Sequence, residues 1–90
     1  MSPKVLEAGP YIFWFHSYDA RFENRASIHI GRSSQDDEND AKDWLEPEIE
    51  VARSGRRLRR HELRTVLAIV EENQAFFLEE WHAYKRRSGG

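Results

Sequence analysis

The segment Tyr11-Ile12-Phe13-Trp14-Phe15-His16-Ser17-Tyr18 is rich in aromatic residues and decides the predicted fold. Aromatic side chains favour β-strands, and apolar residues at both parities indicate a strand that is covered on both faces. The next segment, Ala26-Ser27-Ile28-His29-Ile30-Gly31-Arg32, alternates apolar and polar residues, as a half-buried strand does. Together the two segments predict an antiparallel hairpin whose loop runs over 19–26.

Further short strands are predicted on both sides of this hairpin. Val5-Leu6 lies before Gly9-Pro10, which indicates an edge strand that folds back through a turn. The segments 41–45 and 48–52 lie on either side of Pro47, which has no N–H to donate and therefore belongs at a turn or a strand start. The polar, acidic stretch 33–40 predicts a loop. We expect four or five strands over about 4–52.

The chain changes to a helical period over about 60–87. Glu62 lies in the first turn and Lys85-Arg86-Arg87 in the last, and both positions suit the helix dipole. A straight helix of this length spans roughly 40 Å, whereas four or five strands make a sheet roughly 20–25 Å wide. We therefore expect either a break near 72–75 or an apolar end that packs on another chain. The apolar stripe consists of Leu63, Val66, Leu67, Val70, Phe77, Trp81 and Tyr84.

These elements predict one α+β domain over 1–90, a small antiparallel β-meander with the C-terminal helical region packed on one face. Alternate residues of a strand point to opposite faces, so Phe13 and Phe15 are assigned to the helix-facing side and Trp14 to the other side. The segment 41–45 leaves open whether Leu45 or Trp44 faces the core. The predicted core is Phe13, Phe15, Ile28, Ile30, Leu45, Ile49, Val51, Leu63, Val66, Leu67, Val70, Phe77 and Trp81.

Composition excludes several classes of protein. The 90-residue chain has no cysteine, and its 14 Lys+Arg and 16 Asp+Glu give a formal net charge of -2. A disulfide scaffold, a thiolate metal site and a cysteine nucleophile are therefore excluded. The uncharged run 8–18 is shorter than the roughly 20 apolar residues of a membrane span, and residues 1–4 show no apolar segment of a secretory signal, so we expect a cytoplasmic protein. No Gly-rich phosphate loop, HExxH or GxSxG motif occurs, and no cofactor is expected.

Strand parity brings two histidines to the face of the sheet that the helical region does not cover. Opposed residues on paired strands share a face, so His16 is expected near His29 across the hairpin. Glu48 and Glu50 are expected on the same face, because alternate residues of their strand point inward. Such a set, with Trp14 beside it, suits a divalent metal or acid–base catalysis. The alternative is that these residues are half-exposed sheet histidines and solvated glutamates without a catalytic role.

Charge is unevenly distributed along the chain. The segment 36–50 holds eight acidic residues against Lys42, and 53–64 holds six arginines against Glu62, for net charges of -7 and +5. Guanidinium groups suit bidentate contacts with phosphate, and the start of a helix just after the segment adds N–H donors. The alternative is that the two blocks screen each other on a solvated surface of a chain that is acidic overall. The first interpretation predicts nucleic-acid binding through Arg56, Arg57, Arg59, Arg60 and Arg64.

Several segments in a fixed order carry a resemblance to a known family. They are Ser27-Ile28-His29-Ile30, then Ala41-Lys42-Asp43-Trp44-Leu45, then 63–72 and finally Phe77-Leu78-Glu79-Glu80-Trp81-His82-Ala83-Tyr84. With these segments the chain resembles, over about 5–84, the small bacterial domain-of-unknown-function family 4160. Ala26-Ser27 stands where the family has Pro-His, so only His29 of a histidine pair is kept, and Asp43 stands where the family has an aromatic residue.

The resemblance implies an α+β domain of bacterial origin for which no reaction is established. Relatives are described beside a partner domain, unknown-function family 2442, in gene pairs suspected of toxin–antitoxin roles. Together with the two-faced aromatic strand and the segregated charge, this makes a non-catalytic module that binds a protein partner the leading prediction. Nucleic-acid binding is the alternative, and a metal-dependent or acid–base enzyme ranks third. A homodimer is the alternative to a different partner protein. The residues predicted to make that contact are Trp14, His16, His29 and Trp81.

Overall fold

Five short strands form one antiparallel sheet in the computed structural model, which describes residues 4–36 and 39–87. Strands that follow each other in the chain are neighbours in the sheet, so the order is the predicted meander β1-β2-β3-β4-β5. Val5 and Leu6 lie in an edge strand, as predicted. Of the predicted acidic loop 33–40, Asp37 and Glu38 lie outside the described residues. The strands are β1 (Lys4–Ala8), β2 (Tyr11–Trp14), β3 (Ser27–Arg32), β4 (Ala41–Trp44) and β5 (Glu50–Arg53).

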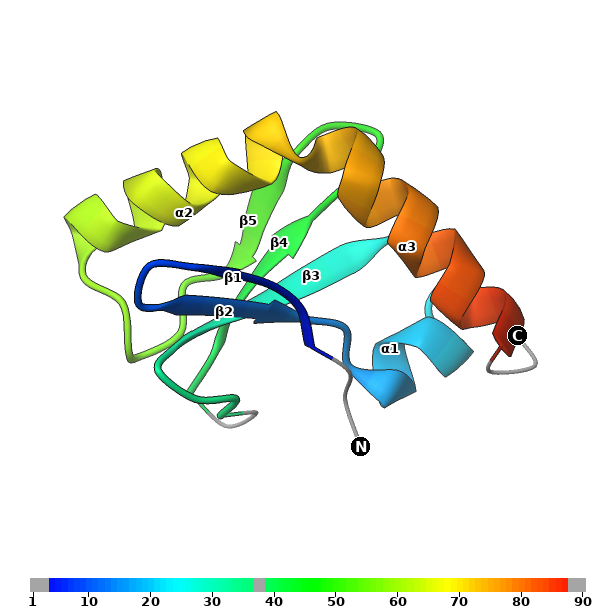
Figure 1. Ribbon diagram of the computed structural model, residues 1–90, viewed down its shortest axis with the longest axis horizontal. Helices are drawn as coiled ribbons and strands as arrows, with labels where there is room; N and C mark the ends of the chain where they lie inside the picture. The colour runs from blue at the N-terminus through cyan, green and yellow to red at the C-terminus, as the bar shows by residue number, and fades with distance from the viewer. Residues whose placement is uncertain (1–3, 37–38, 88–90) are drawn as a thin grey trace.

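Two helices, α2 (Arg60–Glu72) and α3 (Gln74–Arg87), run one after the other along one face of the sheet (Figure 1). The class is therefore α+β, as the change from a strand period to a helical period predicts. No helix within residues 4–36 and 39–87 is long and apolar enough to cross a membrane.

The helical region bends at Asn73, inside the interval 72–75 where the length argument places a break. A straight helix would extend roughly 40 Å, but the molecule is only 36 Å along its longest axis. The backbone N–H of Asn73 donates to Ile69 O at 3.1 Å, and its side-chain Nδ2 donates to the same oxygen at 2.8 Å. This closes α2 and redirects the chain, so that Phe77 and Trp81 of α3 reach the core.

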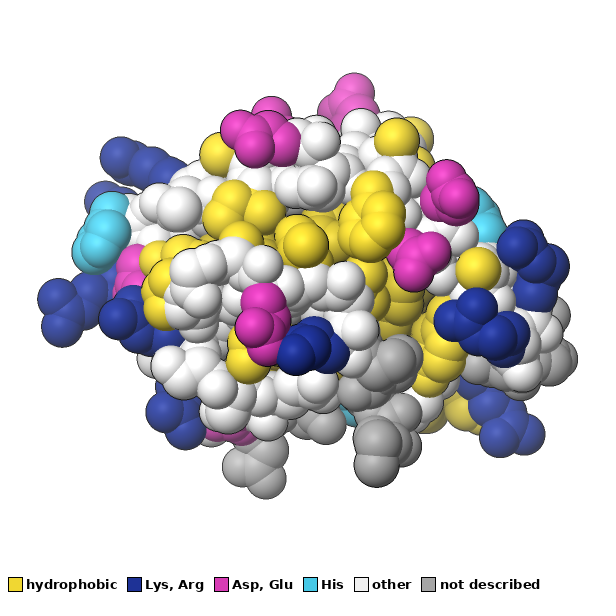
Figure 2. Space-filling view, viewed as in Figure 1, with side chains coloured by type: hydrophobic (Ala, Val, Ile, Leu, Met, Phe, Trp, Pro, Cys, Tyr) yellow, Lys and Arg dark blue, Asp and Glu magenta, His cyan; other side chains and the backbone are white. Residues whose placement is uncertain are grey.

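The core lies between the sheet and the two helices. Phe15 packs edge-to-face on Trp81 with ring centroids 5.4 Å apart, and Phe13 lies 5.7 Å from Phe77. On the face of Figure 2, hydrophobic side chains come to the surface along the line between the helices and β1. Nine predicted core residues are fully or almost fully buried: Phe13, Phe15, Ile28, Ile30, Leu45, Val66, Val70, Phe77 and Trp81.

The predicted core includes one residue that is exposed and three that are only half-buried. Val51 is 44 % exposed, although its register partner Asp43 faces the core. β5 is an edge strand, and a register shift between Lys42 and Asp43 disturbs its pairing with β4, so the helices do not cover Val51. Three other predicted core residues are only half-buried at its rim, namely Ile49, Leu63 and Leu67. Of the pair left open, Leu45 is buried and Trp44 is half-buried.

The predicted strand 11–18 is wrong in its second half. β2 ends at Trp14, and a short helix, α1 (Ser17–Phe22), follows it. His16 is the N-cap of α1, because its Nδ1 accepts a hydrogen bond from the N–H of Tyr18 at 3.2 Å. α1 closes one end of the sheet beside α3 (Figure 1), where Lys85 Nζ donates to the carbonyl oxygen of Glu23 at 2.8 Å.

Candidate functional site

The two predicted histidines come together on the face of the sheet opposite the core. The rings of His16 and His29 lie 5.4 Å apart between centroids, and Trp14 stacks on His29 at 6.0 Å. Trp14 is fully buried, and a Cβ on Gly31 would clash with the backbone oxygen of Ser34 and lie 2.9 Å from the Trp14 ring, so glycine is needed there. Trp81 is fully buried as well. Neither tryptophan therefore offers the exposed contact surface that the sequence predicts for a protein partner.

His29 lies between two buried carboxylates, one on each ring nitrogen. Its Nε2 is 2.5 Å from Asp19 Oδ2, and its Nδ1 is hydrogen-bonded to Asp40 Oδ2. A carboxylate only accepts, so both nitrogens carry a proton and the ring is an imidazolium. Burial acts to lower the pKa of His29, but the hydrogen bonds and charges of Asp19 and Asp40 outweigh it and raise that pKa above its usual 6.5. For Asp19, burial raises the pKa, yet the bond to His29 and the charge of Lys42 hold it well below its usual range.

The charges around His29 form a connected network that joins α1 to three strands. Lys42 Nζ lies 3.0 Å from Glu23 and 3.3 Å from Asp19, and Arg53 of β5 pairs with Asp40. Ser27 Oγ donates to Asp19 Oδ2 at 3.5 Å. Three cations thus face three anions, of which Asp19, His29, Asp40 and Lys42 are buried while Glu23 and Arg53 reach the solvent. Pairing of this kind is what makes buried charges tolerable. The six charged members are Asp19, Glu23, His29, Asp40, Lys42 and Arg53.

This network holds α1 on the sheet and leaves His29 without a free lone pair for base catalysis or metal binding. An imidazolium with both nitrogens occupied neither accepts a proton nor ligates a metal, because both roles need a free lone pair. Glu50 binds Arg25 at 3.4 Å, and Glu48 is exposed in the connection before β5. Within residues 4–36 and 39–87, no group of three or more His, Asp or Glu side chains is arranged to hold a metal ion.

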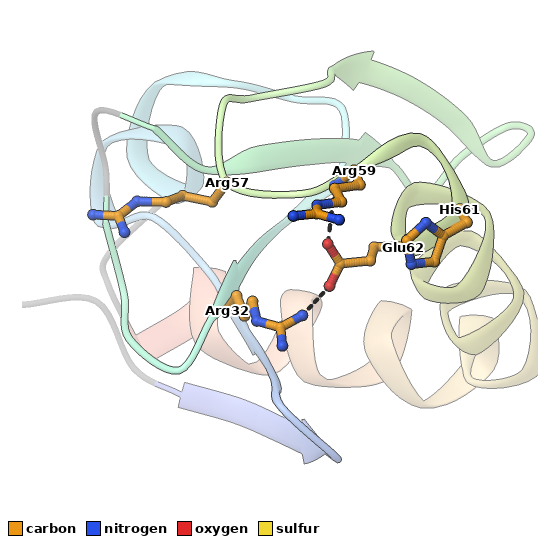
Figure 3. Close-up of a pocket in the computed structure, with 5 residues that line it drawn as sticks. All are labelled: Arg32, Arg57, Arg59, His61 and Glu62. Atoms are coloured by element: carbon orange, nitrogen blue, oxygen red, sulfur yellow. Dashed lines mark hydrogen bonds and ion pairs between the residues drawn. The ribbon is translucent and has the colours of Figure 1, made fainter.

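A second cluster lies where α2 begins, around a hollow of about 490 Å³ (Figure 3). Arg32 reaches it from the end of β3, and Arg57 and Arg59 from the segment before α2. His61 and Glu62 belong to the first turn of α2. Three guanidinium groups and an imidazole therefore line the hollow with a single carboxylate.

That carboxylate is fully engaged within the protein. Glu62 Oε1 accepts from the backbone N–H of Arg59 at 3.0 Å, while Oε2 accepts from Tyr11 Oη at 3.1 Å and from Arg32. The backbone hydrogen bond of Arg59 is the largest cause of a lowered pKa of Glu62, so the group is ionised at neutral pH. On the other side, Asp36 accepts from Arg57 Nη2 at 2.9 Å and from its Nε at 3.1 Å. Arg32 and Arg57 are thus oriented by acids and are still about half exposed.

The sequence-predicted arginines are only partly brought together. Arg57 and Arg59 line the hollow, whereas the other three, Arg56, Arg60 and Arg64, are exposed and do not line it. The prediction misses Arg32 and His61. Arg32 has the parity of Ile28 and Ile30, so it lies on the helix-facing side just past the core, and this parity was the available signal. We call Arg32, Arg56, Arg57, Arg59, Arg60, His61 and Arg64 the basic end; dark blue side chains gather there in Figure 2.

Comparison with known proteins identifies a family but gives no activity, ligand or partner. No curated protein and no solved structure matches the chain. The model of one protein family matches residues 11–82, from the start of β2 to near the end of α3. These residues include His29, its two carboxylate partners and the whole basic end. The chain therefore belongs to the family described as domain of unknown function DUF4160.

Proposed function

We propose that the chain binds the phosphate backbone of a nucleic acid through the basic end. The observation that carries this proposal is the hollow of about 490 Å³, which three arginines and His61 line with one carboxylate whose oxygens are both occupied. The basic end as a whole holds six arginines against Glu62 and Asp36, an excess of four positive charges. This local excess attracts phosphate although the chain is acidic overall, because charges beyond about 8–10 Å are screened at physiological salt.

Binding of this kind is expected to weaken steeply with salt. If the protein neutralises about four phosphates of a single strand, its affinity for that strand falls roughly 50-fold between 50 and 200 mM salt. The reason is that binding releases counterions from the nucleic acid, and this release is less favourable when the solution already contains more salt. Fluorescence anisotropy with mixed-sequence single-stranded RNA and with duplex DNA measures this. Absent binding, or binding that salt does not change, contradicts the proposal.

A pair of matched variants separates the basic end from net charge. Arg59→Gln/Arg60→Gln removes two charges from the basic end, and Arg86→Gln/Arg87→Gln removes two exposed charges from the last turn of α3. Both change the net charge by -2. We expect the first to lower affinity at least about tenfold, on the order of one charge-assisted contact, and the second to change it much less.

A second candidate function is contact with a protein partner, favoured by an exposed aromatic pair on α1. Tyr18 and Phe22 are 60 % and 63 % exposed, and their rings lie 4.7 Å apart. Large aromatic side chains in this setting are typical anchors of protein interfaces. In this proposal, α1 is the contact in a toxin–antitoxin-like pair, and the buried Trp14 and Trp81 support the fold behind it.

The partner proposal is tested by copurification with the product of the neighbouring gene. Tyr18→Ser/Phe22→Ser is expected to abolish the complex, because the two rings supply its apolar anchor. Phe76→Ser, which removes another exposed aromatic from α3, is expected to leave the complex intact. If the native chain, Tyr18→Ser/Phe22→Ser and Phe76→Ser all form the complex equally well, a role for α1 is contradicted.

A further inference from the structure

Four cations of the basic end, from three different segments of the chain, line one hollow, whereas Arg56, Arg60 and Arg64 do not line it. Arg32, Arg59 and His61 come from β3, from the residue before α2 and from its first turn, and all line the same hollow (Figure 3). A protein that follows a polymer backbone spreads its cations along a groove. A hollow of about 490 Å³ instead falls within the range of pockets for small ligands, roughly 300–1,000 Å³.

The acids near the hollow orient its arginines and do not neutralise them completely. Arg32 gives one Nη to Glu62, and Arg57 gives Nε and Nη2 to Asp36. A guanidinium has five N–H donors, so each arginine keeps several for a ligand. Because these side chains are already held, less conformational entropy is lost when an anion binds.

The start of α2 adds backbone donors beside the arginines. The first intrahelical bond runs from Leu63 N–H to Arg59 O at 2.9 Å, so the N–H groups of Arg60, His61 and Glu62 precede the hydrogen-bonded turns. The N-cap residue is Arg59, whose side chain carries only donors and offers no acceptor to cap them. An anion in the hollow is therefore favoured by the helix end as well as by the side chains.

We propose that this hollow binds a phosphate monoester at the end of a nucleic-acid strand, an inference that rests on the proposed function. A monoester carries a charge of about -1.5 to -2 near neutral pH, whereas a backbone diester carries one negative charge. It also presents three terminal oxygens, which suit donors that approach from three directions, as Arg32, Arg59 and the first turn of α2 do. The rest of the strand then lies over the exposed Arg56, Arg60 and Arg64.

The test compares oligonucleotides that differ only at their ends. One single-stranded RNA sequence is prepared with 5′-hydroxyl or 5′-phosphate ends and with 3′-hydroxyl or 3′-phosphate ends, labelled at the opposite end. We expect one phosphorylated end to bind about tenfold more tightly than its hydroxyl counterpart, as one or two added charge-assisted hydrogen bonds imply. Free nucleoside monophosphate serves as a competitor and is expected to compete weakly, since it lacks contacts with the exposed arginines.

Single substitutions test whether the preference for a phosphorylated end comes from the hollow. Arg59→Gln and Arg32→Gln are expected to remove the preference for the phosphorylated end, and Arg59→Gln decides if Arg32→Gln does not fold. Arg60→Gln removes the same charge from a residue that does not line the hollow, so it should weaken all the RNAs equally and keep the preference. Equal binding of phosphate and hydroxyl ends overturns this inference and leaves the proposed function standing. A preference that survives Arg59→Gln overturns the assignment to the hollow, and failure of every RNA to bind overturns both proposals.

Discussion

The His29→Leu variant is expected to lose about 3–5 kcal/mol of unfolding free energy, the usual consequence of removing one partner from a buried ion pair. His29 is 4 % exposed and is bonded on both nitrogens to the buried Asp19 and Asp40. Leucine leaves both carboxylates facing an apolar side chain. Since small domains have a total stability of about 5–15 kcal/mol, the variant should be marginally folded. Urea unfolding followed by circular dichroism measures the loss.

Two further variants allow the loss of unfolding free energy in His29→Leu to be compared with smaller expected losses. Asp19→Asn keeps an acceptor for Nε2 of His29 and loses only the charge, so its loss should be smaller. His82→Leu, on the exposed side of α3, should change stability by less than about 0.5 kcal/mol. This ranking keeps the prediction testable even if His29→Leu does not fold. A loss under 1 kcal/mol for a folded His29→Leu would contradict the network described above.

The protonation of His29 also gives the sign of a pH dependence. Its pKa is raised in the folded protein, so the stabilisation is complete below the unfolded value of 6.5 and is lost as pH rises through the folded pKa. Nitrogen-15 NMR of the imidazole should show both ring nitrogens protonated at pH 7.

The Asp43→Asn variant is expected to be more stable than the native chain at pH 8 and about equally stable at pH 4. Asp43 is 2 % exposed, lies opposite Ile28 on the core-facing side of β4, and its Oδ2 has no hydrogen-bond partner among the described residues. Burial raises its pKa from 3.8 to about 7. The gap between these pKa values corresponds to roughly 4 kcal/mol, an upper figure for the cost of the buried carboxylate.

The sign follows from which state holds the proton. The folded protein keeps Asp43 protonated up to about pH 7, whereas the unfolded chain releases the proton near pH 3.8. Stability therefore falls as pH rises from about 4 to 7 and is constant for this group above that range. Asparagine has the shape of the protonated acid and does not titrate, so its advantage should grow across the same range. Denaturant unfolding at pH 4, 6 and 8 measures it, and a difference independent of pH would contradict the assignment.

Much of the fold follows from local patterns in the sequence. The alternation of Ile28, His29 and Ile30 predicts both the strand and the face of each side chain, because a strand has a period of two. The predicted proximity of His16 and His29 is also found, although His16 lies just past the end of β2 as the N-cap of α1. The helical period and the length argument predict a bend within 72–75, where Asn73 closes α2. Each of these features depends on neighbouring residues and on chain dimensions, which a sequence contains directly.

The errors have one physical origin. Parity predicts which face of a sheet a residue occupies but does not predict what covers that face. Trp14 is on the predicted face, yet it is buried over Gly31. Val51 is on the core-facing side, yet it is exposed on an edge strand. The start of α1 is missed because residues 11–18 are mostly strand-forming aromatic residues. The N-cap His16 is the single signal for a helix start within that segment.

The sequence by itself determined the order and period of the elements, most of the core and the position of the arginine-rich segment. Only the tertiary structure decided the chemistry of the two charged clusters. Asp19 and Asp40 lie 10 and 11 residues from His29 in the chain, on opposite sides, and meet its two nitrogens because α1 and the start of β4 converge on β3. Arg32 joins Arg59 and His61 in one hollow because β3 ends beneath the start of α2. Such contacts depend on how distant segments pack, and local propensity contains no information about them.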